Sequence, residues 1–201
     1  MAIFRPWKEN PHALPATAVE AIRNALLSSP LVGTSTLGGS FKTSRGFAVT
    51  FKGQGRATLE SRFPVLAPFL KAAVKRRANA WYMNLLLIAE GGSINRHVDG
   101  TLHATPMVVS VLYLAAPGGE LVLSRGTREI RRITPREGTL LHFDGDLDHA
   151  VTAFAGPGLR ASLVLEQYRL GEGAHARVPD FKLDSRAGFQ AYLDAHRTST
   201  P

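Results

Sequence analysis

The sequence predicts a mainly β protein with flanking helices, in which closely spaced strands form a sandwich or barrel. Short apolar runs recur between residues 81 and 165, and turns separate them. Before residue 81, two stretches show the apolar spacing of amphipathic helices. The chain has 201 residues, 44% of them hydrophobic, and no shift in composition divides it. We therefore expect one domain over residues 1–201, with helices and a strand in 1–80, a β core in 81–170 and a tail in 171–201.

The first helix is expected directly after Pro15, in the run ATAVEAIRNALLSS. Pro is favoured at a helix start, and the step Ser28-Ser29-Pro30 is a stop signal. A second helical stripe covers residues 58–78 and is bent or restarted around its prolines. Both helices should pack on the outside of the sheet. The apolar stripe of the first helix consists of Val19, Ile22, Ala25 and Leu26.

The strands of the core follow from shorter patterns. Residues 47–52 alternate apolar and polar side chains, and the Gly/Ser/Thr-rich run 32–44 before them is long enough to border an active-site mouth. The run WYMNLLLIA, 81–89, is apolar on both faces and predicts a buried strand. Residues 107–114 predict another strand, and 125–133 predict a ribbon or hairpin. Residues 185–196 are expected to form a closing helix or a frayed tail.

Composition excludes several kinds of site. Without cysteine there is no disulfide, thiolate metal site or Cys nucleophile, so any metal must be held by His and carboxylates. The N-terminus lacks the apolar region of a signal peptide, and no run approaches the ~18 apolar residues of a membrane span. We expect a cytoplasmic protein without membrane contact.

The net charge of +8 favours anionic partners. Two basic clusters are first interpreted as solvated faces. Steering of an anionic small substrate is the alternative, and contact with nucleic acid is permitted by the charge but has no aromatic-interleaved motif to support it. The clusters are Lys71, Lys75, Arg76 and Arg77, and Arg125, Arg128, Arg131, Arg132 and Arg136.

The run GGSINRHVDG, residues 91–100, contains the most informative motif. On an extended strand, His97 and Asp99 project to the same side and can bind one ion. Imidazole and carboxylate suit Fe(II), Mn(II), Co(II) or Zn(II), and a second imidazole completes a facial triad with open positions. His149 is the candidate for that third ligand. A His-x-Asp pattern alone is common by chance, so its context decides.

That context resembles a known family. His-x-Asp is followed by a strand that ends in Tyr113-Leu114, the step Gly118-Gly119-Glu120-Leu121, the distal His149 and, eleven residues later, Arg160. This series is similar to the 2-oxoglutarate/Fe(II) dioxygenases, closest to their prolyl-hydroxylase branch. The resemblance spans residues 81–170 and implies a double-stranded β-helix core, a jelly roll of the cupin type.

The resemblance also implies cofactors and roles. Fe(II) would be held by the catalytic triad of His97, Asp99 and His149, with 2-oxoglutarate and O2 as cosubstrates. Arg160 would bind the distal carboxylate of 2-oxoglutarate through its guanidinium fork. Ser162, two residues on and on the same strand face, would donate a second hydrogen bond. The hydroxyl of Tyr113 would meet the same carboxylate; as an alternative, Tyr113 is a core aromatic.

The chain departs from the family at one cosubstrate contact. Many relatives have Tyr-x-Pro-Gly about nine residues before the first His, whereas this chain has Ile88-Ala89-Glu90-Gly91. Tyr82 or Asn84, earlier on the same strand, are the candidate replacements, and Asn84 could instead satisfy only backbone groups. Related halogenases have Gly or Ala at the carboxylate position, so Asp99 indicates hydroxylation.

The predicted function is hydroxylation of an unactivated C–H bond in a small molecule, such as an amino acid, peptide or related metabolite, with release of succinate and CO2. An anionic or zwitterionic substrate suits the charge. A protein or nucleic-acid substrate for hydroxylation or demethylation, a cupin-like metalloenzyme without 2-oxoglutarate, and a non-catalytic barrel are the alternatives. His103 is expected to be a solvated loop residue, although it could face the substrate, and His142 a packed residue or a support for the ligands.

Overall fold

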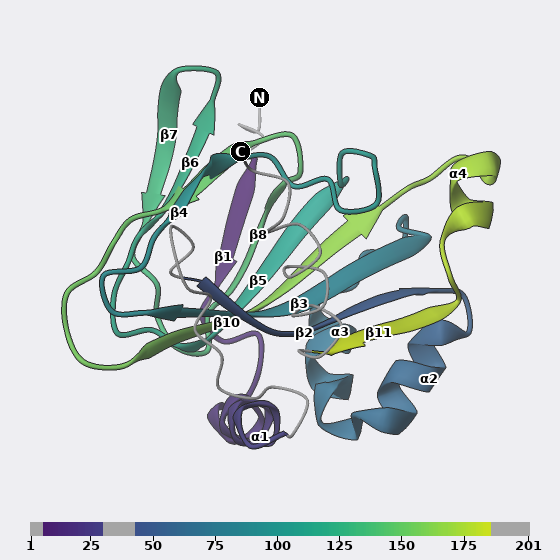
Figure 1. Ribbon diagram of the computed structural model, residues 1–201, viewed down its shortest axis with the longest axis horizontal. Coiled ribbons are helices and arrows are strands. Elements are labelled where there is room, and N and C mark those ends of the chain that lie inside the picture. Colours follow the sequence, from purple (N-terminus) through teal and green to yellow (C-terminus); the bar gives the residue numbers. More distant parts are fainter. Residues whose placement is uncertain (1–5, 30–42, 186–201) are drawn as a thin grey trace, which may run out of the picture.

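Two antiparallel β-sheets form the body of the protein (Figure 1). The computed structural model describes residues 6–29 and 43–185. The large sheet has the order β1 (Trp7–Asn10), β8 (Leu140–Asp144), β5 (Val108–Ala115), β10 (Leu159–Tyr168), β3 (Ala80–Ala89), β2 (Thr43–Lys52) and β11 (Phe181–Ser185). The small sheet has the order β4 (Ile94–His97), β9 (Asp148–Val151), β6 (Leu121–Arg125) and β7 (Arg128–Ile133). The expected mainly β fold with a double-stranded β-helix core is confirmed.

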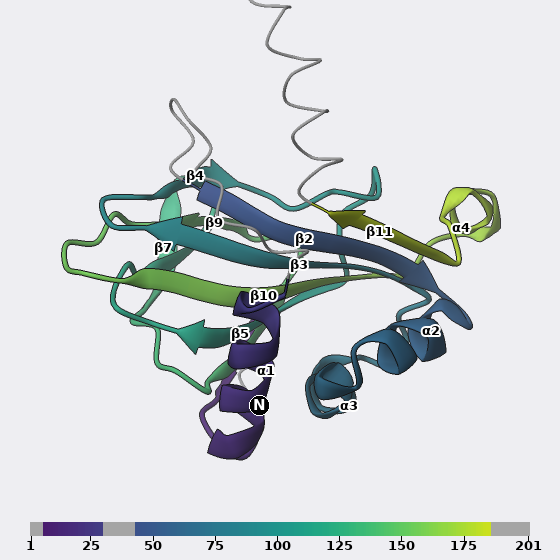
Figure 2. The same cartoon turned by 60° about the horizontal axis from the view of Figure 1, so that its bottom comes forward.

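The helices α1, α2 and α3 cover the outer face of the large sheet (Figure 2). One apolar cluster joins Ile22 of α1, Leu59 of α2 and Phe69 of α3 to the sheet residues Leu112 and Leu163. The expectation that the helices lie outside the sheet is therefore confirmed. Their bounds are α1 (Ala16–Leu27), α2 (Gly55–Arg62), the 3-10 turn η1 (Pro64–Leu66), α3 (Ala67–Ala73) and, near the end of the described chain, α4 (Glu172–Arg177). None of these described helices has the length and apolar character needed to cross a bilayer.

Helix α1 begins and ends where the sequence predicts, but one residue of its stripe is misplaced. Val19, Ile22 and Leu26 are buried, whereas Ala25 is exposed. At 100° per residue, Ala25 lies roughly 90° from the centre of the stripe that the other three define. The second helical region is interrupted at Phe63 and ends at Ala73 rather than at residue 78, because Val74 already has an extended backbone and a turn follows it before β3 begins.

The strand predictions are confirmed for β3, β5, β10 and the β6–β7 hairpin, with corrections at the edges of the sheet. Strand β2 begins at Thr43 and not at residue 47, and its pairing with β3 shifts between Arg45 and Ala48. This irregularity breaks the alternation that marks a strand in the sequence. Strands β1 and β11 were not predicted. The loop 32–44 and the closing segment 185–196 lie almost wholly outside the described residues.

The Gly-Gly step of the sequence motif allows close contact between two chain segments. Gly119 has φ +77°, and a Cβ atom there would lie 2.9 Å from the carbonyl oxygen of Thr152. A Cβ atom on Gly118 would lie 2.8 Å from Cβ of Phe154. Glycine is therefore required at this step, which sets β6 beside β9, the strand that carries His149.

Alternation along β10 separates an apolar face from a polar one. Ala161, Leu163 and Leu165 pack in the cluster beneath the helices. The residues between them point to the opposite side, toward the small sheet. There a second apolar cluster joins Val111 and Phe143 of the large sheet to Leu123 of the small sheet. The polar residues of β10 therefore lie between the two sheets.

Candidate active site

His97 and His149 face each other across a pair of strands in the small sheet. His97 ends β4, His149 lies in β9, and the two are direct partners in the register. Their ring centroids are 4.3 Å apart. The ligand atoms of His97, Asp99 and His149 all lie within 4.8 Å of one another. The structure thus brings together the three residues that the sequence predicts as a triad.

Asp99 reaches this group by a different route from the one predicted. Strand β4 ends at His97, so Asp99 belongs to the following loop, and strand alternation does not explain its direction. Its Oδ1 lies 3.4 Å from His97 Nε2, and its Oδ2 lies 3.5 Å from His149 Nε2. The position of Asp99 therefore depends on how the loop after β4 is held.

Backbone carbonyls orient both imidazoles. Nδ1 of His97 is 2.8 Å from the carbonyl oxygen of Asn95, and Nδ1 of His149 is 3.3 Å from that of Leu147. A protonated Nδ1 donates to each carbonyl, so the neutral form of each ring has its lone pair on Nε2, the nitrogen on the side of Asp99. This is the tautomer in which Nε2 binds a metal ion.

The two imidazoles have different environments. Burial lowers the pKa of His149, and the charge of Asp99 opposes that shift only in part. The ring of His149 also packs against Phe143, with centroids 5.0 Å apart. His97 is exposed, and its hydrogen bond to Asp99 raises its pKa. A lowered pKa favours the neutral form of His149, which is the form that can bind a metal ion, whereas the raised pKa of His97 means that a proton would compete with a cation for its Nε2.

The donor set fits a small divalent cation. Two ligands about 2.1 Å from one ion and at right angles to each other are about 3 Å apart. The separations of 3.4 and 3.5 Å between the histidine nitrogens and the carboxylate oxygens are close to this value. Two imidazoles and one carboxylate are also the set expected for Fe(II).

Arg160 forms the second part of the site, on the inner face of β10. It is 2% exposed, and its Nε has no hydrogen-bond partner. Within residues 6–29 and 43–185, no carboxylate forms an ion pair with it. Burial lowers the pKa of Arg160, because the charged form loses solvation. A buried cation without an anion is costly, so this position fits an anionic ligand.

Two buried hydroxyl groups lie on the same inner face. Ser162 on β10 is the register partner of Tyr113 on β5, and neither hydroxyl has a partner at good hydrogen-bond geometry among the described residues, although Arg160 is close enough to Tyr113 to influence its proton. The Arg160 guanidinium lies 5.4 Å from the centroid of the Tyr113 ring. Burial raises the pKa of Tyr113 to about 12, although the nearby Arg160 charge opposes the shift. The phenol therefore keeps its proton, and its O–H group can donate a hydrogen bond to an anion.

The two candidate replacements for the missing Tyr lie farther along the inner face. Asn84 of β3 pairs with Val164 of β10, and Tyr82 pairs with Glu166. The side-chain oxygen of Asn84 is buried and has no hydrogen-bond partner in the part of the chain that the structure describes, so this residue has an unused acceptor on the inner face. Tyr82 packs in an apolar cluster with Tyr168 and Leu170. Ile88, which stands where many relatives have the Tyr of Tyr-x-Pro-Gly, is the register partner of Arg160.

Glu166 is a site residue that sequence reasoning missed. It is 2% exposed on the inner face of β10, and burial, followed by the charge of Asp99, raises its pKa to about 7. The signal was present in the sequence, because Arg160, Ser162 and Glu166 are separated by even numbers of residues and share one face of a strand.

Two further histidines lie apart from the triad. His103 is exposed in the loop after Asp99 and has φ +57°, as expected for a solvated loop residue in a tight turn. His142 of β8 contacts Ser110 and Lys75 through its two ring nitrogens, at 2.8 and 3.1 Å. It is therefore a packed residue and does not support the ligands.

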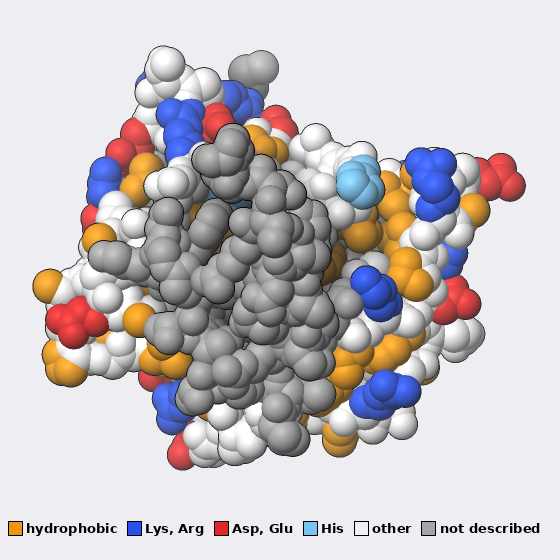
Figure 3. Space-filling model, viewed as in Figure 1, with side chains coloured by type: hydrophobic (Ala, Val, Ile, Leu, Met, Phe, Trp, Pro, Cys, Tyr) orange, Lys and Arg blue, Asp and Glu red, His pale blue; other side chains and the backbone are white. Residues whose placement is uncertain are grey.

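The arginines of the hairpin are largely engaged with acids. Arg125 pairs with Asp146, Arg131 with Glu9, and Arg132 with both Glu120 and Glu129. On the described part of the face in Figure 3, basic side chains are scattered among acidic ones. This arrangement agrees with the interpretation of the hairpin cluster as a solvated face.

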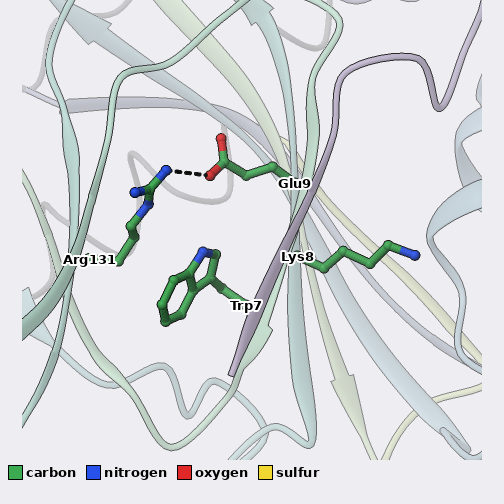
Figure 4. A pocket seen from close by; sticks show the side chains of 4 residues that line it. All are labelled: Trp7, Lys8, Glu9 and Arg131. Carbon is green, nitrogen blue, oxygen red and sulfur yellow. Dashed lines mark hydrogen bonds and ion pairs between the residues drawn. The ribbon is translucent and has the colours of Figure 1, made fainter. Parts of the chain in front are cut away.

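A pocket of about 270 Å³ lies where β1 meets β7, and no member of the triad lines it (Figure 4). Trp7 and Glu9 point toward Arg131, while Lys8 points away (Figure 4). Glu9 accepts a hydrogen bond from Arg131 at 3.2 Å, and the guanidinium lies 6.0 Å from the Trp7 ring. These contacts join the edges of the two sheets.

Comparison with known proteins gives a family for the core. Residues 82–165 match the family model described as the 2OG-Fe(II) oxygenase superfamily. No curated protein sequence matches the chain.

Solved structures share the fold at low sequence identity. A Pseudomonas putida prolyl-4-hydroxylase is 21% identical, with a TM-score of 0.56 over 83% of this chain and 94% of that one. A Trichoplax adhaerens prolyl hydroxylase in complex with a hypoxia inducible factor peptide fragment is 18% identical, with a TM-score of 0.58 over 85% and 86%. HygX from Streptomyces hygroscopicus, with nickel, 2-oxoglutarate and hygromycin B bound, is 14% identical, with a TM-score of 0.52 over 80% and 81%. Given the match over the core, residues 82–165 belong to the 2OG-Fe(II) oxygenase superfamily, and the chain is a 2-oxoglutarate-dependent dioxygenase that uses Fe(II), 2-oxoglutarate and O2.

Proposed function

We propose that the chain hydroxylates an unactivated C–H bond of a small molecule, such as an amino acid, peptide or related metabolite, and releases succinate and CO2. One observation carries this proposal. Between the two sheets, the converging group His97, Asp99 and His149 is combined with Arg160, a buried guanidinium that has no carboxylate partner among the described residues. A cation site and an anion site in one fold are what a chelating dicarboxylate such as 2-oxoglutarate needs.

Each residue has a defined task in this proposal. His97 and His149 offer Nε2 to the metal, with Nδ1 held by a backbone carbonyl, and Asp99 supplies the anionic ligand. Arg160, with the hydroxyls of Ser162 and Tyr113, binds the distal carboxylate of 2-oxoglutarate. When bound, iron with 2-oxoglutarate and O2 supplies the oxidising power for an unactivated C–H bond.

The buried inner face supports this chemistry by excluding water. Val111, Phe143 and Leu123 pack between the sheets, and Phe143 also contacts the ring of His149. A dry environment strengthens the attraction between Arg160 and a carboxylate. Asn84, with its unused acceptor, is a candidate for a further contact to 2-oxoglutarate or substrate, and Tyr82 is the second candidate on that strand.

Hydroxylation is favoured over halogenation because the carboxylate of Asp99 occupies the third ligand position, which would otherwise be open to a halide. The family match argues against a cupin-like enzyme that works without 2-oxoglutarate and against a non-catalytic barrel.

A small, acidic or zwitterionic substrate is supported by the net charge of +8, which favours the approach of anionic compounds. Several hairpin arginines are paired with acids, so an anionic substrate would be attracted by the net charge of the whole molecule and not by one basic patch.

The test is substrate-stimulated succinate formation by the Fe(II)-loaded protein across amino acids, short peptides and related metabolites. We expect the largest stimulation from acidic or zwitterionic compounds. Their apparent affinity should weaken as salt rises toward about 0.5 M, where the Debye length is about 4 Å. Stimulation only by folded proteins or oligonucleotides would contradict the proposal and favour a hydroxylase or demethylase that acts on a polymer.

A further inference from the structure

The arrangement of the three candidate metal ligands depends on a loop that is not part of a helix or a strand. Asp99 lies two residues beyond the end of β4, and strand pairing therefore does not fix its backbone. A ligand that is displaced by even about 1 Å loses much of its contribution to a site. Some other contact must hold the loop.

Among the described residues, a pair of hydrogen bonds from Thr101 to one carboxylate is such a contact, and the backbone N–H of Leu102 also lies 3.5 Å from the Tyr168 hydroxyl. The backbone N–H of Thr101 donates to Oε2 of Glu166 at 3.2 Å, and its hydroxyl donates to Oε1 at 2.8 Å. Both donors of one residue thus bind both oxygens of one side chain. Such a two-point contact fixes the orientation of Thr101 as well as its position, and Thr101 is only two residues from Asp99.

The acceptor of these bonds is fixed in the centre of the large sheet. Glu166 lies on β10, which pairs with β3 on one side and with β5 on the other. The hydroxyl of Tyr168 donates a third hydrogen bond to Oε2 of Glu166. With these three donors, the carboxylate is held in a single orientation.

Stability alone does not explain a carboxylate at this position. Burying a charge costs several kcal/mol, and well-packed apolar residues are often as stable or more stable. The charge of Asp99 adds to this cost, since it is the second cause, after burial, that raises the pKa of Glu166. A benefit other than stability is therefore needed, and the two-point contact with the ligand loop provides one.

We propose that Glu166, acting through Thr101, is a positioning residue that holds Asp99 against His97 and His149 so that the three can bind one metal ion. This inference rests on the proposed metal role of the triad. One face of β10 would then carry both Arg160, which binds the cosubstrate, and Glu166, which holds the loop of Asp99. The strand would thereby fix the distance between the cosubstrate and this loop.

The test compares metal binding by metal-free variants, so it does not depend on turnover. Mn(II) is titrated into the wild type, Glu166→Gln, Thr101→Val and Thr101→Ser, and the thermal midpoint of each metal-free protein is measured alongside. Glu172→Gln, an exposed glutamate on α4, is the matched control. Thr101→Val keeps the backbone N–H and removes only the hydroxyl, so the loop contact is tested even if Glu166→Gln fails to fold.

We expect Glu166→Gln and Thr101→Val to weaken Mn(II) binding by about 10-fold to 100-fold, as loss of a group that orients a metal ligand does. Thr101→Ser should bind within about 3-fold of the wild type because it restores both donors, and Glu172→Gln should not differ. Hydrogen exchange at the Thr101 amide should be faster in Glu166→Gln.

Wild-type Mn(II) affinity in Glu166→Gln and Thr101→Val, with only the thermal midpoint lowered, would overturn the inference and leave Glu166 with a structural role. A wild type that binds no Mn(II) would instead overturn the proposed metal site, and the inference with it. The two failures are therefore distinguishable.

Discussion

At the scale of single residues, the candidate site combines three side chains, whose ligand atoms converge, with a buried cation, Arg160, that has no carboxylate partner among the described residues. The sequence predicted His97, His149 and Arg160 as site residues, because residue type and spacing are sufficient to identify a motif. Spacing could not show how Asp99 reaches the histidines, since the direction of a loop depends on contacts far away in the chain. The spacing does place Glu166 on one strand face with Arg160 and Ser162, but it does not show the hydrogen bonds to Thr101 that give Glu166 its importance.

Removing any ligand of the triad should abolish metal retention. We expect His97→Ala, Asp99→Ala and His149→Ala each to lose bound iron and succinate formation, because two remaining ligands chelate an ion poorly. The fold should remain, since none of the three belongs to the apolar clusters. Metal analysis, succinate assay and circular dichroism test this. Full turnover by His149→Ala would contradict the assignment. Asp99→Gly should also lose hydroxylation, and the ligand position that it leaves open should not by itself make the variant a halogenase.

Arg160 should contribute more to cosubstrate binding than either hydroxyl. Arg160→Ala removes the charge that a buried carboxylate needs, whereas Tyr113→Phe and Ser162→Ala each remove one hydrogen bond to a charged group, worth about 1 to 3 kcal/mol. The KM for 2-oxoglutarate should therefore rise most in Arg160→Ala, with metal content unchanged in all three. Small and equal increases in the three variants would mean that 2-oxoglutarate binds elsewhere.

At the scale of elements, the central strands were predictable and the edge strands were not. The run that forms β3 is buried on both faces, so its sequence is almost uniformly apolar, which is typical of a central strand. The edge strand β1 has only 4 residues, too few to establish an alternation. In β2, next to the edge strand β11, the register is irregular between Arg45 and Ala48, so only its second half, 47–52, shows the alternation that marks a strand. The helical stripe after residue 58 was extended too far because Val74 is apolar and continues the pattern after the helix has ended.

A buried polar network joins the end of α3 to the large sheet and should make stability depend on pH. His142 contacts Ser110 and Lys75, and Gln167 donates to Ser110 Oγ at 2.8 Å and accepts from the backbone N–H of Lys75 at 2.7 Å. Burial, then the charges of Lys75 and Lys8, lowers the pKa of His142 to about 4. An unfolded histidine titrates near 6.5.

Between these two values the unfolded chain binds a proton that the folded protein does not, so the free energy of unfolding should fall as pH drops from about 6.5 to about 4. The loss should be on the order of 1 to 3 kcal/mol after allowance for the partly exposed ring. Urea unfolding near pH 7 and near pH 4.5, for the wild type and His142→Gln, measures it. His12→Gln, an exposed histidine, is the control. An equal pH dependence in the wild type and His142→Gln would contradict the prediction.

At the scale of the whole molecule, the two sheets bring together groups that are distant in the sequence. The triad is on the small sheet and its loop, Arg160 is on the large sheet, and the helices stabilise the large sheet from outside (Figure 2). The sequence predicted this architecture because the barrel is encoded by many short strands. It does not encode the substrate, because the fold is shared by proteins as different as a prolyl-4-hydroxylase and HygX.

The central claim is that one site holds a metal ion through the triad and 2-oxoglutarate through Arg160. Anaerobic titration of the protein with Fe(II) and 2-oxoglutarate tests it most directly, because the chelate has a metal-to-ligand charge-transfer absorption that needs no substrate. We predict that the band appears with one equivalent of Fe(II) in the wild type, is absent in His149→Ala and requires much more 2-oxoglutarate in Arg160→Ala. A wild type that binds Fe(II) but gives no band, or an undiminished band in His149→Ala, would contradict the account.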